Sequence, residues 1–177
     1  MTAVSGSVFT APQFNQFIRD NLLETAPAKA TASGGHFVST GVNEIAERFS
    51  DQGTDLNSGT TTSASFTDLD GPANPGPAVT VTTGMGAWVV VHGQMSNSGT
   101  GSARMAYDVS GATTIAAADN RGVGIAGAAG VIITASGVAL HIGALALTPG
   151  SNTFTAKYRV SAGTGTFLSR RISVLPL

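Results

Sequence analysis

The stretch AVTVTTGMGAWVVVHGQMSNS, residues 78–98, decides how we interpret the rest of the chain. Apolar and polar residues alternate over 79–82, as in a strand with one buried face. After two glycines comes the run 87–91, which is apolar at every position. A strand that is apolar on both faces needs cover on both sides, and the opposite sheet of a sandwich covers only one of them. We therefore expect a second copy of the chain to cover the outer face.

The composition describes a globular chain with few charges. The 177 residues include 9 basic and 10 acidic side chains and no cysteine, which excludes disulfides and thiolate metal sites. The basic residues are scattered and lack interleaved aromatic residues, which argues against nucleic-acid binding. No apolar run approaches the roughly 20 residues of a membrane span, and no charged and then apolar leader comes after Met1. We therefore expect neither a membrane segment nor an export signal.

Residues 10–26 have the pattern of an amphipathic helix. Thr10 is a suitable N-cap, and Gln13 three residues later completes a capping box. Apolar side chains then recur at helical spacing on one stripe until Pro27 ends the pattern. One more apolar residue precedes the cap, as in a hydrophobic staple. The stripe and the staple consist of Phe9, Phe14, Phe17, Ile18 and Leu22.

A helix of this length is marginal alone in water, so its apolar stripe needs a partner. The stripe could pack on the chain's own domain, or it could dock on another molecule. We favour an anchor on another molecule because the next segments resemble a tether. A small hairpin is expected over 36–49 and a polar Gly/Ser/Thr-rich linker over 51–63. The attachment arm would therefore comprise residues 1–50.

From residue 64 to residue 177, short strands recur between Gly, Pro, Asn and Ser turns. The segment 153–160 alternates most clearly, with Phe154, Ala156, Tyr158 and Val160 expected to face the core. About eight or nine strands at this spacing predict a mainly β protein with a sandwich or jelly roll. The expected strands are 65–69, 79–83, 87–95, 102–109, 113–117, 131–135, 139–147, 153–160 and 166–175, with extra pairing near 123–125.

Three segments resemble known viral proteins. TAPQFNQFIRDNLLETAPAKA (10–30), NEIAERF (43–49) and SNTFTAKYRVSAGTGTFLSRRISVLPL (151–177) are similar to minor structural proteins of tailed bacteriophages, of the minor tail, head-fibre or capsid decoration type. The N-terminal motif implies attachment to a virion. The C-terminal half resembles a jelly roll of the TNF/C1q type, which implies a homotrimer with flat sheet faces around the threefold axis. The implied trimer interface contains Trp88, Val90 and His92.

Motifs that carry chemistry are weak in this sequence. Three glycines in RGVGIAG (121–127) match GxGxxG, but no helix pattern and no acidic residue come after them, so we interpret the segment as a loop or bulge where backbones approach closely. Residues 68–71 match the start of a calcium loop but lack its closing Glu, which favours a turn. After Gly71 only Asp108 and Asp119 could serve a glycosidase, which needs a paired acid and base. We therefore expect that the protein is not an enzyme and that it binds no cofactor.

The three histidines, His36, His92 and His141, lack the spacing of a zinc site within one chain. Three copies of His92 could still meet around an ion on a threefold axis. The alternative is an interface histidine held by hydrogen bonds.

Arg170 and Arg171 point to opposite faces of the last strand because side chains alternate along a strand. We expect one of them in solvent and the other in an ion pair with Asp108 or Asp119.

Three classes of function remain. The first is a capsid decoration trimer, whose arm docks on the major capsid protein and whose jelly roll faces outward on the virion. The second is a minor tail or receptor-binding protein that offers its loops to a cell-surface glycan or protein. The third is an enzyme such as a depolymerase, which the shortage of carboxylates disfavours. The outer loops at 96–102 and 118–130 contain no aromatic residue for a glycan, so we favour decoration.

Overall fold

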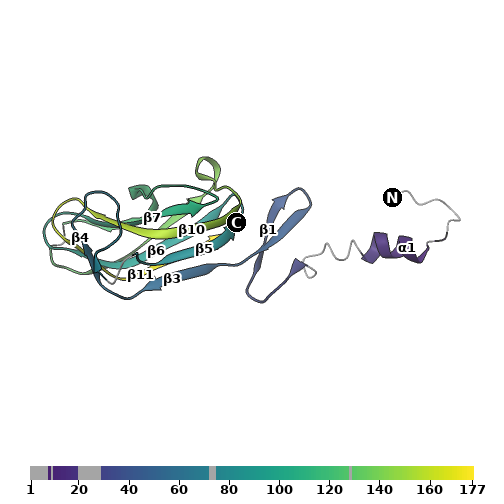
Figure 1. The fold of residues 1–177 in the computed structure, drawn as a ribbon, viewed down its shortest axis with the longest axis horizontal. Helices are drawn as coiled ribbons and strands as arrows, with labels where there is room; N and C mark the ends of the chain where they lie inside the picture. Colours follow the sequence, from purple (N-terminus) through teal and green to yellow (C-terminus); the bar gives the residue numbers. More distant parts are fainter. Residues whose placement is uncertain (1–7, 9, 20–28, 72–74, 128) are drawn as a thin grey trace. The chain divides into compact units, whose positions relative to one another are not determined.

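The structure is a computed structural model that describes residues 8, 10–19, 29–71, 75–127 and 129–177. The chain divides into two compact units, Met1–Glu47 and Arg48–Leu177 (Figure 1). The second unit contains the β sandwich, and the first contains a short helix and a hairpin.

In the first unit, the helix begins where the sequence predicts. The Thr10 hydroxyl accepts a hydrogen bond from the backbone N–H of Gln13, and the Gln13 side chain accepts one from the Thr10 N–H at 3.1 Å, so the capping box is confirmed. The helix α1 covers Ala11–Phe14, and the next five residues, Asn15–Arg19 (η1), are π-helical. The rest of the predicted helix, 20–26, lies outside the described residues.

The predicted hairpin forms from β1 (His36–Gly41) and β2 (Glu44–Arg48). Asn43 in its turn has φ 59°, in the left-handed region that Asn tolerates better than most residues. The Glu47 carboxylate accepts a hydrogen bond from the Thr31 backbone N–H at 2.7 Å and another from the Thr31 hydroxyl. These bonds lower the pKa of Glu47 and tie the preceding segment to the hairpin.

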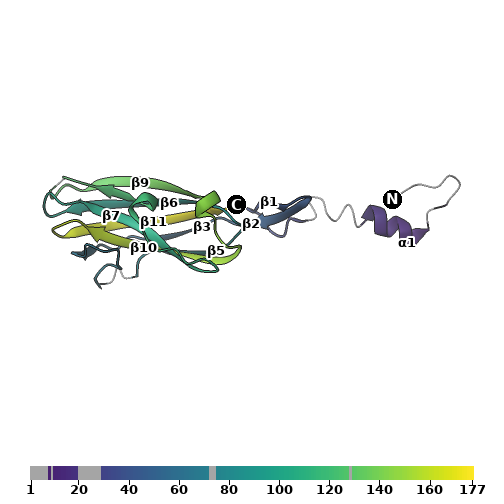
Figure 2. The same ribbon diagram turned by 90° about the horizontal axis from the view of Figure 1, so that it is seen from above.

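The strands of the second unit form two antiparallel sheets that make up the sandwich (Figures 1 and 2). The β10 sheet contains, in order, β5 (Ala78–Thr83), β10 (Gly150–Val160), β7 (Ala103–Gly111) and β8 (Val123–Ile125). The β11 sheet contains β3 (Asp51–Asp55), β11 (Gly165–Pro176), β6 (Ala87–Asn97) and β9 (Ile133–His141), and β4 (Gly59–Thr61) also pairs with β11.

This strand order is that of a jelly roll. Successive strands such as β5, β6 and β7 alternate between the two sheets, and in the β11 sheet the last strand, β11, pairs with β3, β4 and β6. Such connections produce paired Greek keys rather than a simple meander. The prediction of a mainly β jelly roll is confirmed.

The core lies between the sheets and is made of alternate residues along each strand. Phe154, Ala156, Tyr158 and Val160 on β10 are fully buried, as the alternation predicts. Val89 on β6 meets them from the other sheet as part of the same buried cluster. The periodicity of single strands was therefore a reliable guide to the core.

Four of the expected strands differ in the structure. The segments 131–135 and 139–147 are not two strands, because Ser136 and Gly137 pair with β6 instead of turning, and one strand, β9, runs across them. The segments 65–69 and 113–117 contain isolated bridges, from Thr67 to Tyr158 and from Ile115 to Val109, and not full strands. Both lie beside longer strands that already have partners over most of their length.

The prediction of a linker over 51–63 is wrong, because β3 and β4 within it pair with β11 and widen its sheet. The Gly/Ser/Thr composition reflects close packing here. A Cβ atom on Gly53 would lie 2.5 Å from the backbone oxygen of Ala78, so only glycine lets the two segments approach this closely.

A buried ion pair fixes β3 to the sandwich. The Arg170 side chain is fully buried, and its Nη2 donates hydrogen bonds to Asp55 Oδ2 at 2.5 Å and to the Asn57 carbonyl at 3.1 Å. The prediction that Asp108 or Asp119 is the ion-pair partner is therefore wrong. The reason is a bulge before Arg170, where Ser169 has φ 49° and the register shifts, which turns Arg170 inward toward β3.

We predict that Asp55→Ala destabilises the second unit by about 3–5 kcal/mol, because it leaves the buried Arg170 charge without its carboxylate. Urea unfolding followed by circular dichroism measures this loss. The matched control is Asp51→Ala, an exposed acidic residue on the same strand, which should change the free energy of unfolding little. Equal effects of the two substitutions would show that the ion pair does not hold β3.

His141 at the end of β9 is buried and fully hydrogen-bonded. Its Nδ1 donates to the Leu145 carbonyl at 3.0 Å, so its Nε2 accepts from the Tyr107 hydroxyl at 2.7 Å. Burial lowers the pKa of the imidazole, against the opposing effect of the bond to Leu145. Burial likewise raises the pKa of Tyr107, which keeps its hydroxyl proton.

We predict that this histidine makes folding stability depend on pH. As pH falls through the ordinary histidine pKa of 6.5, the unfolded chain binds a proton that the folded chain does not yet bind. The free energy of unfolding should therefore fall below that pH, by at most about 1.4 kcal/mol per pH unit, until the lowered pKa is reached. Urea titrations at several pH values test this, and His141→Asn should have the shallower slope. Identical slopes would contradict the assignment.

Candidate functional site

The outer face of the β11 sheet gathers apolar side chains from three strands. Directly paired residues of antiparallel strands point to the same side of the sheet, so the register fixes which side chains meet. We call the resulting surface the apolar face. Two adjacent rows cross it, Leu175–Trp88–Leu140 and Ser173–Val90–Val138.

The apolar face is exposed in the single chain. Trp88 is 45% exposed, Val90 37%, Val138 60% and Leu175 40%, whereas the alternate residue Val89 is fully buried. Single exposed apolar residues are ordinary on proteins, whereas a group of neighbouring ones from three strands is a feature typical of interaction surfaces. The described part of the sandwich leaves this face without cover, as the sequence predicts. That a second copy covers it stays a prediction.

The next row across the same face is polar. His92 lies between Arg171 and Ser136, and its Nδ1 is 2.8 Å from the Ser136 hydroxyl. His92 shares this face with Trp88 and Val90, as expected from their spacing along β6. Among the residues that the structure describes, no three His, Asp or Glu side chains lie close enough together to hold a metal ion. The face therefore passes from apolar to polar along β6.

A hollow of about 370 Å³ lies beside the apolar rows. Its lining includes Val90, Leu175 and the small Ser173, together with Gln52 on the neighbouring strand β3. Ser173 pairs with Val90 on one side and with Gln52 on the other, so the hollow opens where the shortest side chain of the row lies. An apolar side chain from another molecule would find room there.

Sequence reasoning missed three members of the apolar face, Val138, Leu140 and Leu175. Their alignment with Trp88 and Val90 depends on which strands pair and in what register, and local periodicity carries no such information.

The predicted anchor is only partly within the described residues. Phe14 is 52% exposed and Ile18 43% exposed, so both remain available for contact. Phe17 belongs to the π-helical segment, and Phe9 and Leu22 lie outside the described residues. Across the described part of the chain, no helix has the length and apolar character needed to cross a membrane.

The weak sequence motifs have structural explanations. The glycine-rich segment contains the short strand β8, and a Cβ atom on Gly122 would collide with the Met105 carbonyl, so the close backbone approach is confirmed. Asp68 forms an ion pair with Lys157 at 2.7 Å, and Gly71 adopts φ 79°, as in a turn.

No family model matches the sequence, and no curated protein matches it. Among solved structures, the Eiger TNF of S. frugiperda is 14% identical to this chain, with a TM-score of 0.48. The match covers 73% of this chain and 92% of the Eiger TNF chain. A chain in a structure of infectious bursal disease virus, Gx strain, is 10% identical, with a TM-score of 0.44. The match covers 77% of this chain and 35% of the viral chain. Since both scores lie below 0.5, we assign the jelly roll from its strand order.

Proposed function

We propose that this protein is a homotrimeric decoration protein of a tailed-bacteriophage capsid. In this proposal the first unit docks on the major capsid protein, the apolar faces meet around a threefold axis, and the jelly roll is displayed outward. The observation that carries the proposal is the apolar face, which the described part of the sandwich does not cover. The sequence resemblance to minor structural proteins of phages supports the choice of particle.

A second copy of the chain suits the apolar face. Fully burying an exposed large apolar side chain contributes about 1.5–3 kcal/mol. Trp88, Val90 and Val138 are already partly buried, so covering the surface that they still expose contributes a fraction of this each and favours association. The two ends of the face also differ, because Val138 projects on the β9 side and the hollow opens on the β3 side. Such unlike ends suit a head-to-tail contact, which forms a ring when the rotation closes. Three copies form the ring that the TNF/C1q resemblance implies.

We predict that Val90→Arg converts the trimer into monomers or aggregates, because the substitution would bury an unpaired charge in the interface. Sedimentation velocity measures the assembly state. Emission from the single tryptophan, Trp88, should shift to the red as that face becomes wet.

The control for this experiment is Thr82→Arg, which places the same side chain on the exposed face of β5 in the other sheet. It should sediment as the wild-type trimer does. An intact Val90→Arg trimer, or a wild-type chain that is monomeric or dimeric, would contradict the threefold interface.

The anchor would gain strength from the three copies of the arm on each trimer. Three arms on one trimer bind as a unit, because the first attachment raises the effective concentration of the other two. We predict that Phe14→Asp with Ile18→Asp greatly reduces incorporation into virions and leaves a folded trimer. Asn15→Asp with Gln16→Asp is the matched control, because it adds the same charge beside the stripe. Normal loading of the first double variant would rule out this anchor.

The number of copies per particle separates decoration from the second candidate, a minor tail or receptor-binding protein. Quantitative mass spectrometry of purified virions gives the ratio of this chain to the major capsid protein. Hundreds of copies support decoration. A handful would move the protein to the tail, and its absence from particles would contradict both roles.

A further inference from the structure

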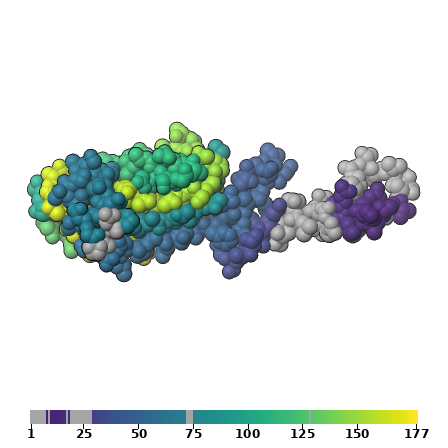
Figure 3. Space-filling view, viewed as in Figure 1, coloured from purple at the N-terminus to yellow at the C-terminus, as the bar shows by residue number. Residues whose placement is uncertain are grey.

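A groove of about 660 Å³ crosses the outer face of the β10 sheet. Figure 3 shows the side of the domain on which β7 and β10 lie. Side chains of these two strands line the groove, together with the segments 64–68 and 116–117. The apolar face belongs to the other sheet, so a binding site in this groove would not depend on the proposed trimer.

The groove is preformed. Thr67 and Tyr158 exchange two backbone hydrogen bonds, at 2.8 and 2.9 Å, which hold one flanking segment against β10. Ile115 and Val109 exchange two others of the same lengths, which hold the opposite segment against β7. The flanking segments also carry small side chains, including Ala116, so the space between them is not filled.

Fixed charges lie in the groove. Lys157 Nζ is 2.7 Å from Asp68 Oδ1 and 3.6 Å from Asp108 Oδ2. Burial alone would lower the pKa of Lys157, but the two carboxylates outweigh it and raise the pKa. The ammonium group therefore stays charged, and both carboxylates keep lone pairs for further hydrogen bonds.

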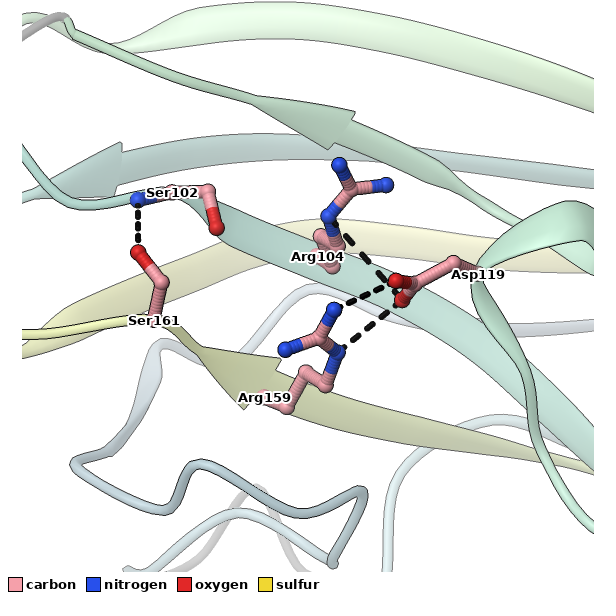
Figure 4. A network of polar contacts seen from close by, with 5 residues as sticks. All are labelled: Ser102, Arg104, Asp119, Arg159 and Ser161. Atoms are coloured by element: carbon pink, nitrogen blue, oxygen red, sulfur yellow. Dashed lines mark hydrogen bonds and ion pairs between the residues drawn. The ribbon is translucent and has the colours of Figure 1, made fainter.

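Arg159 supplies a second set of donors beside an aromatic ring. Its Nε donates to Asp119 Oδ1 at 2.9 Å and its Nη2 donates to Asp119 Oδ2, while Arg104 approaches the same carboxylate at 3.9 Å (Figure 4). The guanidinium carbon lies 5.4 Å from the centre of the Phe66 ring. This bidentate bond fixes the orientation of the guanidinium group and lowers the pKa of Asp119.

These ion pairs explain little of the stability of the fold. The Lys157, Arg159 and Asp119 side chains are 20%, 23% and 44% exposed, and pairs at such positions contribute about 0–1 kcal/mol. What the pairs do is hold donors and acceptors in place around the groove before any ligand arrives, which reduces the entropy lost on binding.

We infer that this groove binds a neutral oligosaccharide. Sugar hydroxyls both donate and accept hydrogen bonds, so they can bridge the carboxylates of Asp68 and Asp108 and the cations of Lys157 and Arg159. Phe66 lines the groove and is partly exposed, so the part of its ring that Arg159 does not cover offers apolar surface to the C–H face of a sugar ring. Each cation already faces a carboxylate, so an anionic ligand would have to displace that partner, and a neutral one would not.

The test is an array of immobilised neutral oligosaccharides, with sialylated and sulfated versions of each, probed with the full-length chain. We expect neutral members to bind and their charged versions to bind more weakly. Ala116→Trp should fill the groove and weaken binding about tenfold or more, equivalent to about 1.4 kcal/mol. Thr114→Trp is the matched control, because it adds the same side chain to an exposed position of the same loop and outside the lining. It should bind as the wild type does.

Phe66→Leu provides a second variant that keeps an apolar side chain and removes the ring. It should also weaken binding, with an unchanged circular dichroism spectrum. The inference is overturned if no neutral oligosaccharide binds, if charged versions bind better, or if Ala116→Trp binds as Thr114→Trp does. Titration of the soluble sugar into the Val90→Arg variant separates the two proposals, because one groove per chain should bind equally well whether or not the trimer forms.

Discussion

The alternation of side chains along β6 is the constraint on which the rest of the structure depends. Val89 and Val91 enter the core, which forces Trp88 and Val90 onto the outer face. Because β6 pairs with β11 on one side and β9 on the other, it lies inside its sheet, and no described edge or loop of the second unit covers its outer residues. A two-layer sandwich buries one face of each sheet, so the outer apolar residues of β6 stay exposed in the described part of the sandwich, and the proposed contact with a second copy is based on this exposure.

Buried polar side chains fix the parts of the sandwich that apolar packing leaves free. Asn152 accepts a hydrogen bond from the Thr113 N–H and donates one to the Thr83 hydroxyl, both at 2.8 Å, so it joins a loop to two strands. Arg170 performs the same role for the edge strand β3 through Asp55. In a low-dielectric core, such groups stabilise only the arrangement in which every partner is present. They therefore specify the positions of loops and edges more than they add stability.

Sequence reasoning succeeded where the controlling interactions are local. The capping box at Thr10 and Gln13 and the alternation of β10 depend on residues a few positions apart. It failed where partners are distant in sequence. The strands β3 and β4 were mistaken for a linker because Gly, Ser and Thr are typical of linkers, and nothing local reveals that β11 lies beside them. The ion pair between Arg170 and Asp55 depends on a bulge at Ser169, and no pattern in the sequence predicts this bulge.

The same distinction applies to the candidate site. Trp88, Val90 and His92 could be placed on one face because they lie two residues apart on one strand. Val138 and Leu175 join them only through strand register, which is a property of the whole fold. The groove on the β10 sheet was missed for the same reason, since Asp68, Asp108 and Lys157 come from three separate segments. Because alternate residues of a strand face opposite ways, each outer face of the jelly roll can acquire its own chemistry without disturbing the core. The outer face of the β11 sheet carries the apolar rows and the outer face of the β10 sheet carries paired charges, so the two proposals, assembly through one face and sugar binding on the other, involve different sheets of a single sandwich.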